Sequence, residues 1–368
     1  MNDTPIQVTK TYLPSLEEYS ELLSTVWENQ WVTNGGPLIR KLETVLSDRF
    51  STTTQVVSNG TVALQIALRA LDLTGTVITT PFSYVATTNA LLWEGLTPIF
   101  VDIEDRWCTL DPNLVEAAIR EDTTAILATH VYGYPCQHHQ LLAIAERHGL
   151  ALIYDAAHAF DVSVGGQSIL GWGDISTLSF HATKVFHTIE GGAVIASREE
   201  LIEKIDLLRS FGHRGSDYLT MGINGKNTEL HAAIGLLNLP RLPANREARK
   251  RISDTYRDLL SGLPLRFLHP ADFPGLYYNY AYFPVFCQDH DMREDLIAAL
   301  NEQQIFPRRY FEPSLNELPY LPEKVRSSCP VSERAARTVL CLPLYPDLSL
   351  TEVRRICAIV RKSVLQWV

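Results

Sequence analysis

Between residues 55 and 200 the chain alternates short apolar runs with segments that are patterned as helices. The runs are apolar throughout, which is typical of strands covered on both faces, whereas a half-exposed strand alternates apolar and polar residues. Repeated strand–helix alternation predicts a mostly parallel, seven-stranded sheet with helices on both faces, in the α/β class. The expected strands are 55–58, 76–79, 98–103, 125–131, 151–155, 175–180 and 193–196.

The rest of the chain indicates a second, smaller domain. A length of 368 residues predicts about two domains, at roughly 150 residues each. We expect a large domain over residues 1–245 and a small C-terminal α+β domain over 246–368. The elements expected in this later part are helices at 244–261, 292–304 and 351–366 and a strand in AYFPVFC, 281–287.

Charge and cysteine usage narrow the class of protein. Acidic residues outnumber basic ones, 42 against 32, and this argues against nucleic-acid binding, because Lys and Arg hold phosphate backbones. No run of 18 apolar residues is present and no signal-peptide pattern opens the chain, so we expect no membrane segment. The six cysteines are scattered, without a C-x-x-C pair, which suits a reducing compartment. These features predict a cytoplasmic protein.

The segment Ser58-Asn59-Gly60-Thr61 lies where an expected strand ends and a buried helix begins. Such a turn directs free backbone N–H groups and the positive end of the helix dipole at one point, which suits an anion. The helix that follows is apolar nearly all round, so its N-terminus should face a cleft. An ordinary strand–helix turn is the alternative for this segment taken alone.

Asp155 ends the expected strand 151–155, at the carboxyl edge of the sheet, where ligands bind in folds of this class. A carboxylate at this place can hold a metal, a ribose hydroxyl or a protonated ring nitrogen. A helix cap is the alternative.

Lys184 follows another expected strand, in the segment S-F-H-A-T-K-V-F-H-T-I-E-G-G-A at 179–193. A partly buried lysine has a lowered pKa and can bond covalently to a carbonyl carbon. His181 and His187 in this segment are not at a common zinc spacing, so we expect no metal site.

An anion-binding helix end, a carboxylate at a strand end and a lysine are together the groups that pyridoxal 5′-phosphate (PLP) needs. With these residues in place, the chain resembles the DegT/DnrJ/EryC-type sugar aminotransferases, which share the fold-type-I architecture of aspartate aminotransferase. The resemblance runs nearly end to end. Its segments are W-V-T-N-G-G-P (31–37), S-N-G-T (58–61), T-T-P-F-S-Y-V-A-T (79–87), P-I-F-V-D-I (98–103), H-V-Y-G (130–133), D-A-A-H-A (155–159), S-F-H-A-T-K (179–184), G-I-N-G-K-N-T-E-L-H-A-A-I-G (222–235) and L-C-L-P-L-Y-P (340–346).

The resemblance implies roles for individual residues. Lys184 matches the lysine that holds PLP covalently and shuttles a proton, and Asp155 matches the partner of its ring nitrogen. Asn224 matches an asparagine that reaches the phosphate in the neighbouring subunit, which implies a homodimer with shared active sites. The full set of implied cofactor-binding residues is Ser58, Asn59, Gly60, Thr61, Tyr84, Asp155, His158, Ser179, Lys184 and Asn224.

The sequence marks the substrate-binding residues less clearly than the cofactor-binding residues. The pair Arg308-Arg309 beside Tyr310 suits a nucleotide diphosphate by charge and stacking, with a solvated turn as the alternative. The aromatic-rich stretches LYYNYAYF (276–283), RRYF (308–311) and WVTN (31–34) suit either a pocket wall or the core. The chain departs from the family pattern at Lys226-Asn227 and His231. The expected substrate-binding residues are Thr33, Asn34, His213, Arg308, Arg309 and Tyr310.

The resemblance implies transamination of a nucleotide-linked keto-sugar, with L-glutamate as amino donor and 2-oxoglutarate as its product. V-T-K-x-Y-L-P-S-L-E-E at 8–18 and F-H-A-T-K-V-F-H-T at 180–188 favour the branch that converts dTDP-4-dehydro-6-deoxy-D-glucose to dTDP-4-amino-4,6-dideoxy-D-glucose for O-antigen or lipopolysaccharide synthesis. A 3-keto-sugar aminotransferase is the nearest alternative. A dehydrogenase is disfavoured because no G-x-G-x-x-G is present, and a regulator that binds PLP without turnover stays open.

Overall fold

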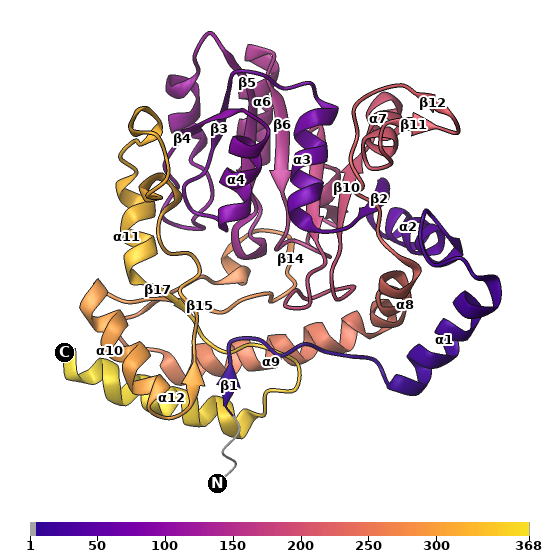
Figure 1. Cartoon of the computed structure of the whole chain (residues 1–368). Helices are drawn as coiled ribbons and strands as arrows, with labels where there is room; N and C mark the ends of the chain where they lie inside the picture. Colours follow the sequence, from indigo (N-terminus) through magenta and orange to yellow (C-terminus); the bar gives the residue numbers. More distant parts are fainter. Residues whose placement is uncertain (1–4, 368) are drawn as a thin grey trace.

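The computed structural model describes residues 5–367, and a seven-stranded sheet forms the centre of its larger part (Figure 1). Every neighbouring pair in this sheet is parallel except the two that involve one strand, β10. In spatial order the strands are β2 (Thr53–Val57), β10 (Gly192–Ala196), β9 (Ile175–Ser179), β6 (Ala151–Asp155), β5 (Thr123–Thr129), β3 (Thr76–Thr79) and β4 (Thr97–Phe100).

All seven expected strands lie in this sheet, and β3 and β6 have the expected bounds. Strand β5 ends two residues early because the chain turns sharply at Tyr132, whose φ is 55°. The sheet is mostly parallel, as expected, and its one antiparallel strand is β10, which pairs with both β2 and β9. The reason is the connection: residues 180–191 contain turns in place of a crossover helix, so the chain returns beside β9 in the opposite direction.

Helices cover both faces of the sheet, and the alternation along β5 shows how. Ala125 and Leu127 enter one hydrophobic cluster, whereas Ile126 and Ala128 enter another. Successive side chains of a strand point to opposite faces, so the two clusters lie on the two sides of the sheet. The first side is packed by α3 (Gly60–Ala70), α4 (Val85–Trp93) and α7 (Glu199–Leu208), and the second by α2 (Pro37–Phe50), α6 (His138–His148) and α8 (Glu229–Asn238).

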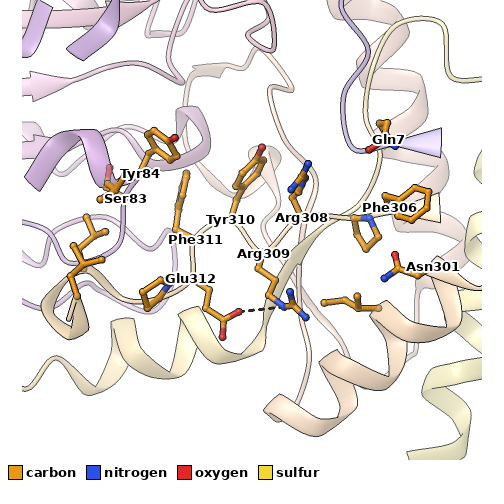
Figure 2. Close-up of a pocket in the computed structure, with 16 residues that line it drawn as sticks. Gln7, Ser83, Tyr84, Asn301, Phe306, Arg308, Arg309, Tyr310, Phe311 and Glu312 are labelled. Carbon is orange, nitrogen blue, oxygen red and sulfur yellow. Dashed lines mark ion pairs between the residues drawn. The ribbon is translucent and has the colours of Figure 1, made fainter. Parts of the chain in front are cut away.

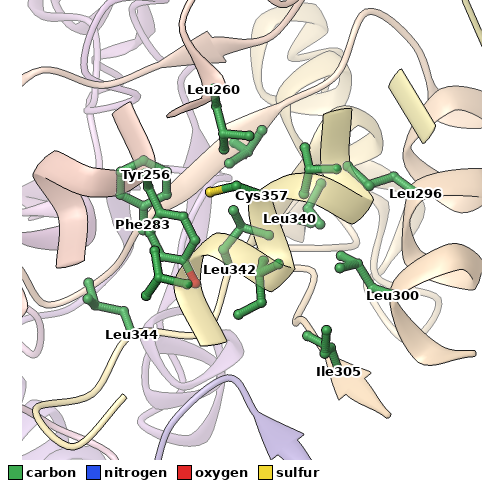
Figure 3. Close-up of a cluster of buried hydrophobic side chains, with 14 of the residues drawn as sticks. Tyr256, Leu260, Phe283, Leu296, Leu300, Ile305, Leu340, Leu342, Leu344 and Cys357 are labelled. Carbon is green, nitrogen blue, oxygen red and sulfur yellow. The ribbon is translucent and has the colours of Figure 1, made fainter. Parts of the chain in front are cut away.

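A separate hydrophobic core holds the C-terminal part together (Figure 3). Tyr256, Leu296 and Cys357, from three different helices, meet in it. The three helices that the sequence predicts here are present, with ends within three residues of expectation. The elements are α9 (Leu242–Leu260), α10 (His290–Asn301), α11 (Pro330–Thr338), α12 (Leu350–Val364) and a sheet of β13 (Arg266–Phe267), β15 (Pro284–Phe286) and β17 (Val339–Cys341).

The N-terminal strand packs with the C-terminal core. Strand β1 (Ile6–Gln7) pairs in parallel with β16 (Ile305–Phe306), and Ile6 is buried in the C-terminal core. The boundary at residue 245 itself stays a prediction, since α9 contributes Leu242 to the cluster beside the main sheet and Tyr256 to the C-terminal core.

The remaining α-helices and strands are short, apart from one peripheral helix. They are α1 (Leu16–Asn29), α5 (Pro112–Val115), the β11–β12 hairpin (His213–Arg214, Asp217–Tyr218) and a small sheet of β7 (Ser163–Val164), β8 (Gln167–Ser168) and β14 (Leu276–Tyr277). Among the helices of residues 5–367, none combines the length and the apolar character that a membrane span requires.

Candidate active site

A cavity of about 620 Å³ lies where β2, β6 and β9 end, which is the edge at which α/β sheets bind ligands. Residues that follow these strands form its polar wall, and aromatic side chains from the C-terminal part complete it. All the expected cofactor residues except Ser58 and Asn224 line this one cavity. Its lining includes Asn59, Gly60, Thr61, Tyr84, Asp155, His158, Ser179, His181, Lys184, Glu190, Tyr282, Tyr310 and Phe311.

The N-terminus of α3 forms the anion-binding end of the cavity. Asn59 caps the helix, and its Oδ1 accepts a hydrogen bond from the Val62 amide at 2.9 Å. Within residues 5–367 the amides of Gly60 and Thr61 have no protein acceptor, so they are available to a bound anion. A Cβ atom at Gly60 would lie 2.9 Å from the Cβ of Ser179, so only glycine lets this turn pack against the end of β9.

Ser58 and Asn224 lie outside the lining of this cavity. The Ser58 amide donates to the Gly225 carbonyl at 2.7 Å, which holds the end of β2 beside the segment that carries Asn224. Asn224 is exposed, and its backbone forms a bridge with Ser210. Its side chain is therefore available to a second molecule rather than to the cavity of its own chain.

Asp155 is the buried acid of the site, with 5% of its surface exposed. Its Oδ2 accepts a hydrogen bond from the Thr87 hydroxyl at 2.7 Å, and its Oδ1 accepts one from the Ala157 amide at 3.1 Å. Burial raises the pKa of Asp155, while the two hydrogen bonds and the positive charge of Lys184 oppose that rise. The carboxylate is thus fixed in orientation and suited to a cationic N–H partner.

Lys184 projects into the same cavity from the loop after β9. Its Nζ donates a hydrogen bond to the Tyr282 hydroxyl at 3.4 Å. Burial lowers the pKa of Lys184 to about 8, while the negative charge of Asp155 acts to raise it. The neutral, nucleophilic amine is therefore a minor form at neutral pH, but it is far more populated than in an ordinary lysine.

His158 is buried beside Asp155 and held in one tautomer. Its Nδ1 accepts a hydrogen bond from the Tyr132 amide at 3.3 Å. Burial, aided by the charge of Lys184, keeps the pKa of His158 well below its usual range, so the ring is neutral. A neutral ring that accepts at Nδ1 carries its proton on Nε2, which makes His158 a hydrogen-bond donor to a ligand.

Several residues of the site were not foreseen individually. Tyr282 and Phe311 come from stretches that the sequence marks only as aromatic, and His158 stacks on the Phe311 ring at 5.4 Å between centroids. Other tyrosines of the same stretch, such as Tyr278, belong to the hydrophobic core, so both interpretations of these aromatics apply. Thr87 ends the segment 79–87 that carries part of the resemblance, but nothing in the sequence links it to Asp155.

A second cavity, of about 750 Å³, adjoins the first, and the two share Tyr84, Tyr310 and Phe311 (Figure 2). It lies between the start of α4 and the segment that follows β16. Arg308 and Arg309, both expected to bind substrate, line this second cavity.

The other expected substrate residues lie apart from these two cavities. Asn34 and His213 line a third cavity, of about 420 Å³, together with Phe211 and Lys226. Thr33 lines none of the three. Their assignment to the substrate therefore stays a prediction.

The sequence profile of the DegT/DnrJ/EryC1/StrS aminotransferase family matches residues 15–361. The chain is 40% identical to a dTDP-4-amino-4,6-dideoxy-D-glucose transaminase of Escherichia coli over 359 residues, which is 95% of this chain and 96% of that protein. It is 32% identical to a UDP-N-acetyl-3-dehydro-alpha-D-glucosamine 3-aminotransferase of Acidithiobacillus ferrooxidans over 311 residues, 83% of each chain. The structure of DesI in the presence of its TDP-sugar product has a TM-score of 0.93 at 33% identity, covering 98% of this chain and 93% of that chain.

These matches confirm the resemblance and the fold class that the sequence predicts, and they exclude the dehydrogenase alternative. The chain belongs to the DegT/DnrJ/EryC1/StrS aminotransferase family.

Proposed function

We propose that the protein is a PLP-dependent transaminase acting on a nucleotide-linked keto-sugar. The observation that supports the cofactor is the convergence of three groups on one cavity: the free amides at the start of α3, the buried carboxylate of Asp155 and the amine of Lys184. A phosphate, a ring nitrogen and an aldehyde would each find a complementary partner there. The exposed ring of Tyr84, at the rim, is available to stack on the cofactor ring.

When bound, PLP supplies an electron-withdrawing ring that stabilises negative charge on the carbon next to the transferred amino group. Asp155 would keep a proton on the ring nitrogen, because its carboxylate is held in place by Thr87 and Ala157. The Nζ of Lys184 would bond the resting cofactor and then, once freed, carry the proton between two carbons as a general base and acid. The Nε2–H of His158 would donate a hydrogen bond to the ring oxygen of the cofactor.

For the substrate we propose dTDP-4-dehydro-6-deoxy-D-glucose, converted to dTDP-4-amino-4,6-dideoxy-D-glucose with L-glutamate as amino donor. The 40% identical relative from Escherichia coli bears the name of this activity, and DesI was solved with a TDP-sugar product. Amination at the 3-position is the second candidate, favoured by the 32% identical 3-aminotransferase. Use of the product in O-antigen or lipopolysaccharide synthesis is part of the same proposal.

Assembly and location also belong to the proposal. We infer a homodimer with shared active sites, because Asn224 is exposed and lies away from its own chain's cavity. A cytoplasmic location agrees with the six cysteines, all of which are buried as free thiols in the part of the chain described. We also propose that the boundary between the large and small domains lies at residue 245.

The experiment supplies PLP and L-glutamate with either the 4-keto or a 3-keto nucleotide sugar, and follows 2-oxoglutarate and product. We expect one equivalent of 2-oxoglutarate for each amino sugar, with the amine at C4 by NMR. An amine at C3 would select the second candidate. Loss of the visible cofactor band on addition of glutamate alone separates an enzyme from a regulator, and no loss would refute transamination.

A further inference from the structure

Arg308 and Arg309 are adjacent and chemically identical, but in the structure their side chains have different surroundings. Arg308 lies in extended backbone, where its amide donates to the Cys341 carbonyl at 3.2 Å and its carbonyl accepts from the Cys341 amide at 2.7 Å. Successive side chains of extended backbone point to opposite sides. Figure 2 shows the result: Arg308 points to the same side as Tyr310, whereas Arg309 points the other way, to Glu312.

Arg309 is already occupied by ion pairs. Its Nε lies 3.0 Å from Glu294 Oε1 and 3.4 Å from Glu312 Oε2. Both carboxylates also contact the buried Arg293, whose Nη2 is 2.9 Å from Glu294 and 2.8 Å from Glu312. Two arginines and two glutamates thus form a closed network whose charges cancel, so Arg309 has no charge to spare for a ligand.

Arg308 differs, since the residues from 5 to 367 supply it with no carboxylate partner. Its side chain is exposed and lines the second cavity. Its charge is felt at the neighbouring hydroxyl: burial raises the pKa of Tyr310 to about 12, and Arg308 acts to lower it. Because the Tyr310 ring lines both cavities, an uncompensated cation lies close to their junction.

We propose that Arg308, and not Arg309, binds an anionic oxygen group of a substrate at the junction of the two cavities. The inference rests on the proposed function and adds a ligand subsite to it. Two groups of the proposed substrates have this chemistry: the diphosphate of the nucleotide sugar and a carboxylate of the amino donor. The further extent of the 750 Å³ cavity, past the aromatic ring of Phe306, offers room for a nucleoside beyond the anion and so favours the diphosphate.

The test measures ligand binding to the PLP-loaded protein by calorimetry, with dTDP and 2-oxoglutarate as probes. Arg308→Gln should weaken dTDP binding about tenfold or more, because a hydrogen-bonded charge pair is lost. Arg308→Lys, which keeps the charge but loses the planar donor pair, should fall between wild type and Arg308→Gln. Arg309→Gln should leave dTDP affinity near that of the wild type and instead lower thermal stability, because the carboxylates of Glu294 and Glu312 lose a partner.

Loss of dTDP affinity alone in Arg308→Gln assigns the diphosphate, and loss of 2-oxoglutarate affinity alone assigns the carboxylate. The inference is overturned if Arg308→Gln binds both probes within about twofold of wild type, or if Arg309→Gln loses as much affinity as Arg308→Gln. If only the inference about Arg308 is wrong, addition of glutamate should still remove the visible absorbance band of the bound cofactor. A wild-type protein that neither binds the probes nor responds to glutamate would refute the proposed function as well.

Discussion

The hydroxyl of Tyr282 lies 3.4 Å from Nζ of Lys184, although the two residues are 98 positions apart in the chain. The Tyr282 ring packs edge-on against His158, at 5.0 Å between centroids, which fixes its place in the cavity. Burial raises the pKa of Tyr282, so the phenol stays neutral and can exchange hydrogen bonds with the amine in either of its charge states.

Tyr282→Phe should therefore slow the proton transfers of Lys184 while leaving binding of both substrates nearly unchanged. One hydrogen bond worth about 0.5–1.5 kcal/mol corresponds to a loss of about two- to thirteenfold in kcat. The measurement is a single-turnover rate with glutamate across a pH series. Tyr278→Phe is the control: its hydroxyl donates to the Tyr132 carbonyl in the core, so stability should fall while the rate of the folded enzyme holds. Equal rates for wild type and Tyr282→Phe at every pH would contradict a positioning role.

The sequence allows prediction of the sheet and of the groups that local patterns mark. Asp155 ends one expected strand and Lys184 follows the next, so their meeting at one edge of the sheet follows from parallel strand order. The contact of Lys184 with Tyr282 could not be predicted, because it depends on how the C-terminal part packs against the sheet. It could not be predicted either that Arg309 is ion-paired and Arg308 is not. Arg309 is paired with Glu294, and the backbone of Arg308 is held by Cys341, and both partners are distant in the sequence. The direction of β10 is set by its connection rather than by its own apolar residues.

Lys184→Ala should fold and bind pyridoxamine phosphate, but its turnover should fall by several orders of magnitude, because nucleophile and general base are lost together.

In the wild type, covalent uptake of PLP by the apoprotein should speed up as pH rises through about 8 and level off above it, because only the neutral amine reacts. Stopped-flow absorbance of PLP uptake measures this profile. A rate independent of pH, or an active Lys184→Ala variant, would place the reacting amine elsewhere.

Asp155→Asn should keep the cofactor but slow the proton shift strongly, because an amide cannot balance a positive charge on the ring nitrogen. Asp155→Glu should also be slow, since the longer side chain cannot keep the hydrogen bonds from both Thr87 and Ala157. Thr87→Val, which removes one of those bonds and keeps the shape, should have a smaller effect in the same direction. Single-turnover absorbance with glutamate compares the three variants. If Asp155→Asn reacted at the wild-type rate, Asp155 would have only a structural role, as a cap at the end of the strand.

We predict that Glu229 stabilises the loop of residues 31–36, which leads into α2. It is 1% exposed, and its carboxylate accepts hydrogen bonds from the amides of Leu38 and Ile39, at 2.7 and 2.9 Å, at the start of α2. In Glu229→Gln one acceptor becomes a donor that faces an amide, so the free energy of unfolding should fall by about 1–3 kcal/mol. Urea unfolding measures the change, with Glu17→Gln on the exposed surface of α1 as the control. Equal midpoints for Glu229→Gln and the control would show that the carboxylate contributes nothing to the loop.

Asn224 provides the test of shared active sites. Its side chain is exposed and lies outside the cavity of its own chain, so a phosphate that it binds would belong to a second subunit. Asn224→Ala should then weaken cofactor affinity by about 1–3 kcal/mol, the cost of a lost hydrogen bond to a charged group. Mixing this variant with Lys184→Ala gives the sharper result. If the sites are shared, a mixed dimer has one site with both lesions and one with neither, so activity should return at a limiting PLP concentration at which each variant alone is inactive. With subunit exchange verified by mass, no return of activity would mean that Asn224 serves its own subunit or no site.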